Sequence, residues 1–135
     1  MTHSLNVKIY YEDTDAGGVV YYANYLRYME RARTEFLAEY GINVAEYHDQ
    51  GIFFVVTHVD IIYKRPARLG EKIYITTEVV ELRNASMTIK NHIFREDTLL
   101  VEALLTFACI DKDGKLRRLP DSFVALKPLS KKNCS

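Results

Sequence analysis

The sequence has few of the features that mark specialised protein classes. Its 135 residues include two cysteines, Cys109 and Cys134, which is too few for a disulfide framework, and a domain of this size does not need one. The 18 basic and 18 acidic residues cancel, whereas nucleic-acid-binding domains are typically strongly basic. Apolar runs reach only four or five residues, far short of the roughly 20 of a membrane span. With no signal peptide visible, we expect a soluble cytoplasmic protein without nucleic acid partners or membrane spans.

Several motifs that bind cofactors or activate nucleophiles are also absent. The chain has no phosphate-binding GxxxxGK[ST] or GxGxxG loop and no GxSxG nucleophile elbow. Asp13, Asp15 and Gly18 have the spacing that begins a calcium loop, but the closing glutamate is missing. The histidines show no spacing typical of zinc ligands; they are His3, His48, His58 and His92. We therefore expect neither a cofactor nor a metal.

The composition is that of a globular protein, with 48% apolar and 27% charged residues, and it predicts one domain over residues 1–135. The charges are unevenly distributed. Residues 1–51 carry four basic and eight acidic side chains, whereas residues 111–135 carry seven basic and three acidic ones. The basic end suits an anionic ligand or an acidic partner surface, but it is equally compatible with a solvated tail.

Hydrophobic periodicity predicts a strand over residues 5–11 and one long helix over residues 24–40. The helix is indicated by Tyr25, Met29, Ala32 and Phe36, which fall on one face, and Gly41 supplies a C-terminal cap. A short irregular or helical piece is expected over residues 43–50.

The rest of the chain is predicted to be β-structure. Strands are expected over residues 52–64, 72–82, 86–95 and 99–111, and a turn at Asp113-Gly114 leads into a return strand over residues 115–119. The pattern predicts an α+β fold in which one amphipathic helix covers one side of a six-stranded antiparallel sheet.

The densest polar cluster, Glu12-Asp13-Thr14-Asp15, lies between the first strand and the helix. A carboxylate just before a helix lies near unsatisfied backbone N–H groups, an arrangement that can hold an anion or polarise a carbonyl. The spacing alone is equally compatible with an ordinary acidic loop.

The residues around this cluster resemble those of a known family. The stretch from Tyr11 to Leu26, YEDTDAGGVVYYANYL, followed by ERARTE at residues 30–35, resembles the hotdog-fold acyl-CoA thioesterases of the 4-hydroxybenzoyl-CoA thioesterase group. Within that group it is most similar to the Tol–Pal-associated bacterial enzymes. The resemblance implies a hotdog fold, with a six-stranded antiparallel sheet wrapped around the long helix. It also implies a homodimer with one continuous sheet, usually paired into a tetramer, and active sites at the subunit interface.

The resemblance further implies roles for two residues. Asp15 corresponds to the catalytic carboxylate, and the backbone N–H of Tyr22, seven residues later, corresponds to the donor that polarises the thioester carbonyl. Many relatives carry histidine at the second position, so an imidazole role is not supported here. Asp15 can act as a nucleophile or as a general base on water, and the sequence leaves both open.

Further residues are expected to contact substrate. Coenzyme A is anionic, so its phosphates should meet basic side chains, for which the candidates are Lys64, Arg65, Arg68, Arg83 and Lys90. Gly18 belongs to the catalytic loop, and the acyl tunnel is expected to involve Tyr21, Tyr25 or Tyr28. His58 and Asp60 lie on the strand expected to cross the dimer interface, where packing is a better expectation than catalysis. Glu30 and Arg33 are spaced to pair on the helix.

The leading interpretation is hydrolysis of acyl-CoA thioesters to a free acid and coenzyme A. The alternative is a non-hydrolytic module of the same fold that binds acyl carrier protein or organises a complex, which would not need Asp15. A dehydratase of this fold would need a catalytic histidine that the motif lacks.

Overall fold

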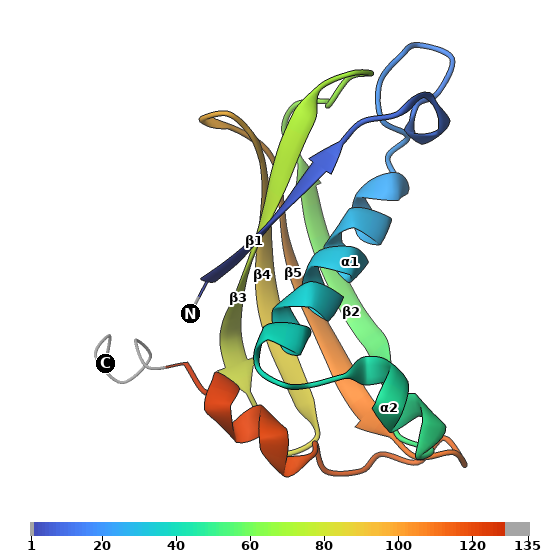
Figure 1. Cartoon of the computed structure of the whole chain (residues 1–135), viewed down its shortest axis with the longest axis vertical. Helices are drawn as coiled ribbons and strands as arrows, with labels where there is room; N and C mark the ends of the chain where they lie inside the picture. Colours follow the sequence, from blue (N-terminus) through green and yellow to red (C-terminus); the bar gives the residue numbers. More distant parts are fainter. Residues whose placement is uncertain (1, 129–135) are drawn as a thin grey trace.

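A computed structural model describes residues 2–128 of the chain. Five strands form one antiparallel sheet in the order β1-β3-β4-β5-β2, and the long helix α1 lies across one face of it (Figure 1). The elements, in chain order, are β1 (Thr2–Lys8), the 3-10 helix η1 (Tyr11–Asp13), α1 (Asn24–Glu39), α2 (Val44–Asp49), β2 (Phe53–Tyr63), β3 (Lys72–Leu82), β4 (Ser86–Arg95), β5 (Thr98–Ile110) and the 3-10 helix η2 (Asp121–Leu126).

Helix α1 forms as its periodicity predicts. The predicted stripe is buried against the sheet, and Met29, Ala32 and Phe36 are fully inaccessible to solvent. The helix ends at Glu39, and Gly41 follows with φ +77°, a left-handed conformation that glycine adopts without steric cost. The amphipathic pattern thus fixes both the extent of α1 and the face that it turns to the sheet.

The core beneath α1 is divided by a polar row. One cluster packs around Tyr25, Tyr28 and Met29, and the other around Phe36 and Leu37. Between them lie the buried Thr77 of β3 and Asn91 of β4, whose Nδ2 donates to Thr77 Oγ1 at 3.0 Å. This bond partly compensates the desolvation of the two polar side chains.

The expected sixth strand does not form. Residues 115–119 make only an isolated bridge between Leu116 and Ile110, although the preceding turn forms and Asp111 Oδ1 accepts the N–H groups of Asp113 and Lys115. The reason lies in the sheet order: β5 is flanked by β2 on one edge and by β4 as far as Ala108 on the other, so only the last residues of β5 can meet a returning segment. There Arg117 N–H donates to Cys109 O and Asp111 N–H donates to Lys115 O, both within hydrogen-bond distance. Residues 2–128 therefore contain five strands, not six.

Two smaller differences concern the helices and the first strand. The piece expected over residues 43–50 contains α2, whose first turn is capped by Asn43 Oδ1, so α1 is not the only α-helix. Strand β1 begins at Thr2 and ends at Lys8, because Tyr10 and Tyr11 leave the sheet and enter η1. Cys134 lies outside the described residues. No helix within residues 2–128 is long and apolar enough to cross a membrane.

Candidate active site

Asp15 lies at the tip of a tight loop between β1 and α1. Its backbone N–H donates to Val19 O at 2.9 Å, and its carbonyl accepts the N–H of Gly18 at 3.0 Å. The carboxylate is exposed, and Oδ1 accepts the N–H of Gly17 at 2.8 Å. Oδ2 makes no hydrogen bond within the described residues, so the loop holds the carboxylate by one oxygen and leaves the other available.

The loop is docked onto a second segment that is remote in the sequence. Val20 N–H donates to Ala67 O at 2.8 Å, and Leu69 N–H donates to Gly18 O at 3.0 Å. Val19 and Arg68 form an antiparallel bridge between these two bonds. The backbone of residues 67–69 therefore fixes one side of the Asp15 loop to the sheet.

The start of α1 fixes the other side of the loop. The carbonyl of Asp13 accepts two donors from this region, the N–H of Tyr21 and Nδ2 of Asn24, each at 3.0 Å. The residue that precedes the helix, Ala23, offers no side-chain cap. The N–H groups of Tyr22 and Ala23 donate to no acceptor within residues 2–128. A helix start with unpaired N–H groups thus adjoins the Asp15 loop, an arrangement that favours negative charge on a ligand.

Aromatic side chains form a hollow beside this helix start. Its volume is about 230 Å³, and it is lined by Val20, Tyr22, Tyr25, Tyr63, Lys64, Arg65 and Pro66. The Tyr63 ring centroid lies 6.3 Å from that of Tyr22 and 5.6 Å from that of Tyr25, and the Tyr63 hydroxyl donates to Tyr22 O at 3.4 Å. The hollow therefore combines apolar walls with two basic residues.

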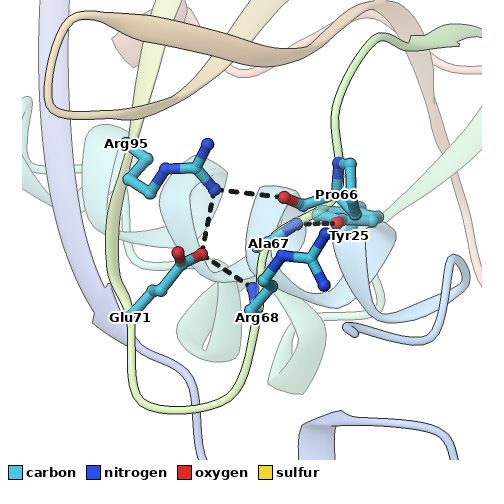
Figure 2. Close-up of polar contacts among 6 residues, drawn as sticks. All are labelled: Tyr25, Pro66, Ala67, Arg68, Glu71 and Arg95. Carbon is cyan, nitrogen blue, oxygen red and sulfur yellow. Dashed lines mark hydrogen bonds and ion pairs between the residues drawn. The ribbon is translucent and has the colours of Figure 1, made fainter. Parts of the chain in front are cut away.

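Tyr25 has a structural role within this hollow. Its hydroxyl accepts the N–H of Ala67 at 3.0 Å, which ties α1 to the segment that supports the Asp15 loop (Figure 2). The side chain is almost fully buried, and this desolvation raises the pKa of the Tyr25 phenol.

A sequence model of the thioesterase-like superfamily matches residues 10–126 of the chain. The chain belongs to this superfamily. The acyl-CoA thioester hydrolase YbgC of Escherichia coli strain CFT073 is 42% identical over 121 residues, which cover 88% of this chain and 90% of the relative. The acyl-CoA thioesterase YbgC of Helicobacter pylori strain 26695 is 35% identical, with 94% and 96% covered. A probable thioesterase from Bartonella henselae superposes with a TM-score of 0.84 at 37% identity, covering 89% of this chain and all of that one.

Membership of the superfamily confirms the resemblance inferred from the motif at residues 11–35. Of the expected site residues, Asp15 and Gly18 share one loop, and Tyr22, Tyr25, Lys64 and Arg65 meet at the hollow. Tyr63 was missed by the sequence analysis. The signal that could have found it is its place directly before Lys64-Arg65-Pro66, at the end of a strand.

Three expected substrate contacts lie elsewhere in the single chain. Arg83 is in the turn after β3, at the end of the sheet opposite the Asp15 loop in Figure 1, where it makes two hydrogen bonds with Glu81. Lys90 alternates with the buried Ile89 and Asn91, so it lies on the sheet face away from α1. His58 is exposed on β2, opposite Thr106. Within one chain none of these three joins the hollow, and their contact with substrate stays a prediction.

Two further expectations concern the helix. The expected ion pair forms, but it is long, with 4.0 Å between Arg33 Nη2 and Glu30 Oε2. Burial of the guanidinium lowers the pKa of Arg33. Tyr28 is buried, and its hydroxyl makes no hydrogen bond within the described residues. Burial raises the pKa of Tyr28, and the nearby Asp13 carboxylate raises it further.

Proposed function

We propose that this protein hydrolyses acyl-CoA thioesters to free carboxylic acids and coenzyme A. The observation that carries the proposal is the exposed Asp15 carboxylate, held by one oxygen, on a loop that Asp13 fastens to the start of α1. The N–H groups of Tyr22 and Ala23 at that helix start have no acceptor among the described residues. The names of the YbgC relatives agree with this chemistry.

The proposed division of labour follows from charge. As the thioester carbon is attacked, negative charge develops on its oxygen, and the Tyr22 N–H at the start of α1 would donate to that oxygen. In other enzymes the loss of one such donor costs about 3–4 kcal/mol of transition-state stabilisation. The Tyr22 side chain is not required for this role, because the donor belongs to the backbone.

Two routes remain for Asp15. As a nucleophile, its carboxylate attacks the thioester carbon, the coenzyme A thiolate leaves and takes up a proton, and water then hydrolyses the acyl–aspartyl anhydride. As a general base, it accepts a proton from water while the water oxygen attacks, and the same thiolate leaves. A burst of coenzyme A equal to the concentration of sites, ahead of acid release, would indicate the anhydride.

The basic residues at the hollow support recognition of coenzyme A. The Lys64 and Arg65 side chains are exposed, and their backbone N–H groups both donate to Leu100 O, at 2.8 Å and 3.1 Å, which anchors them to β5. Arg68 is also exposed and lies on the segment that supports the Asp15 loop. We propose these three cations as contacts for the phosphates of coenzyme A.

We also propose that the working unit contains at least two chains. Strand β2 pairs with β5 along one edge, and its other edge has no partner strand within residues 2–128. The strand also exposes four large apolar or aromatic side chains, those of Val55, Val56, Ile62 and Tyr63. Such an edge is a ready template for a further strand. Pairing of two β2 edges would give the continuous sheet that the family resemblance implies. Light scattering should give a mass of at least twice 15.6 kDa, and a monomer would refute this part of the proposal.

The function is tested with purified protein and a panel of short-, medium- and long-chain and aromatic acyl-CoAs, with release of coenzyme A as the readout. Asp15→Asn should lower kcat at least ~100-fold with little change in KM, because the amide oxygen can still accept the Gly17 N–H while the negative charge is lost. Asp49→Asn, at an exposed position on α2, is the matched control and should keep the wild-type rate. No release from any substrate, together with binding of acyl carrier protein, would instead favour the non-hydrolytic module.

A further inference from the structure

A polar cluster beside the proposed site involves no residue of the motif. Arg95, the last residue of β4, reaches over the loop between β2 and β3 (Figure 2). Its Nη1 donates to Pro66 O at 3.1 Å and to Glu71 Oε1 at 2.9 Å. The same Glu71 oxygen accepts the backbone N–H of Arg68 at 2.8 Å. The two side chains thus hold the backbone of this loop at two points, Pro66 and Arg68.

This loop is also the support of the Asp15 loop. Ala67 O and Leu69 N–H bond the backbone of residues 18–20, and Glu71 O accepts the N–H of Ile9, where the chain leaves β1. The cluster therefore acts on the segment that supports the Asp15 loop and also presents the basic residues of the hollow. Arg95 reaches Asp15 only through this backbone.

Exposed ion pairs usually contribute little to stability, but this pair differs in two respects. Each side chain is only 28% exposed, which reduces screening by solvent. The pair also binds backbone groups at Pro66 and Arg68, so its geometry is transmitted directly to the loop. The planar guanidinium can meet two acceptors in a fixed arrangement, which a lysine ammonium on a flexible stem does not reproduce.

We propose that Glu71 and Arg95 are positioning residues for the catalytic loop, which they hold in the register that places the Asp15 carboxylate against the thioester. This inference rests on the proposed function. It predicts that loss of the pair lowers kcat more than it raises KM, because the substrate-binding side chains remain while the attacking group loses its position.

The test compares Arg95→Met, Arg95→Lys, Glu71→Gln and the Arg95→Met/Glu71→Gln double variant. Arg118→Met is the matched control, because Arg118 is an exposed arginine in an ion pair with Asp121. Arg95→Met should lower kcat about tenfold with KM changed less than about twofold, and lysine should restore only part of the loss. Because the two residues act as a unit, the double variant should lose little more than Arg95→Met alone.

A second readout is independent of turnover. Amide hydrogen exchange at Val20 and Leu69, whose N–H groups join the two loops, should become faster in Arg95→Met, while exchange at Ile89 and Leu105 in the sheet stays slow. If Arg95→Met fails to fold, Arg95→Lys and Glu71→Gln decide by the same two readouts.

The outcomes separate the inference from the function on which it rests. An inactive wild-type protein, or a fully active Asp15→Asn variant, refutes the proposed function. Wild-type kcat and unchanged exchange in the Arg95 and Glu71 variants, with Asp15→Asn inactive, overturn the positioning role alone. A raised KM at unchanged kcat also overturns it, because Arg95 would then contact coenzyme A directly.

Discussion

The two adjacent glycines of the Asp15 loop offer a way to separate crowding of the carboxylate from strain in the backbone. A Cβ added at Gly17 would lie 3.3 Å from Asp15 Oδ1, so the carboxylate would have to move by a few tenths of an ångström. At Gly18, φ is +80° and a Cβ would meet no heavy atom within 4 Å. Gly17→Ala therefore perturbs the acid itself, whereas Gly18→Ala perturbs only the conformation of the chain.

The magnitudes follow from these two geometries. A misplacement of 1 Å can cost about 100-fold in rate, so a shift of a few tenths of an ångström should lower kcat about 3- to 10-fold in Gly17→Ala. The backbone of Gly17 accepts alanine, so its free energy of unfolding should stay within ~1 kcal/mol of wild type. At Gly18 the left-handed conformation costs about 1–2 kcal/mol for a residue with a Cβ, and this variant should be destabilised by about 1 kcal/mol.

Both quantities are measurable on the same preparations. Steady-state release of coenzyme A gives kcat, urea unfolding gives the free energy, and Asp15→Asn sets the floor of activity. The reasoning would be refuted if Gly17→Ala kept the wild-type kcat while Gly18→Ala lost activity at unchanged stability. That pattern would show that the carboxylate tolerates crowding and that the backbone at Gly18 carries the catalytic geometry.

Other consequences concern the core. Tyr28→Phe removes a buried hydroxyl that makes no hydrogen bond within residues 2–128, so urea unfolding should show stability raised by up to ~1 kcal/mol. A loss of that size would reveal a bond to Asp13 in solution. Burial raises the pKa of Tyr25 and Tyr28, so with rising pH the unfolded chain loses these phenol protons before the folded protein does. The free energy of unfolding should therefore fall as the pH rises above about 10, and the fall should be less steep in Tyr28→Phe. Burial likewise raises the pKa of the Cys109 thiol. In a Cys134→Ser variant, which leaves Cys109 as the remaining thiol, a thiol reagent at pH 8 should react only after unfolding. Reaction in the native state would contradict the burial of Cys109. Met29→Ala should cost about 2–5 kcal/mol in urea unfolding, because Met29 is fully buried between α1 and the sheet, and a loss below 1 kcal/mol would indicate that the core repacks.

Most of the fold was predictable because its signals are local. The alternation of residues 72–82 and 86–95 gave β3 and β4 with the bounds that the structure has, and the helical period gave α1 to within one residue. The prediction of a sixth strand over residues 115–119 was wrong, because sheet order is not visible in local sequence patterns. The turn at Asp113-Gly114 forms, but the strand that should follow it competes with β2 and β4 for the edges of β5.

The candidate site divides in the same way. Asp15, Gly18 and Tyr22 lie within eight residues of one another, so a motif could identify them together. Lys90 was expected at the substrate because it is basic; its alternation with Ile89 and Asn91 places it on the sheet face away from α1, and its contact with substrate stays a prediction. The charge of a side chain indicates which ligands it can bind, whereas the pairing of distant strands determines which residues and ligands lie near it.

The positioning residues illustrate why a motif is an incomplete description of this site. Glu71 and Arg95 act through Pro66 O and the Arg68 N–H. Many types of side chain can form a hydrogen bond with a backbone group, so such a contact requires no characteristic sequence motif. The contacts between residues 18–20 and 67–69 are also made by the backbone, so the amino acids at those positions do not reveal them. The residues proposed to carry the chemistry, Asp15 and Tyr22, are therefore close together in the sequence. The residues proposed to orient them are brought to the site by the pairing of distant strands. Variants that impair catalysis without unfolding the protein should accordingly occur at the end of β4 as well as in the Asp15 motif.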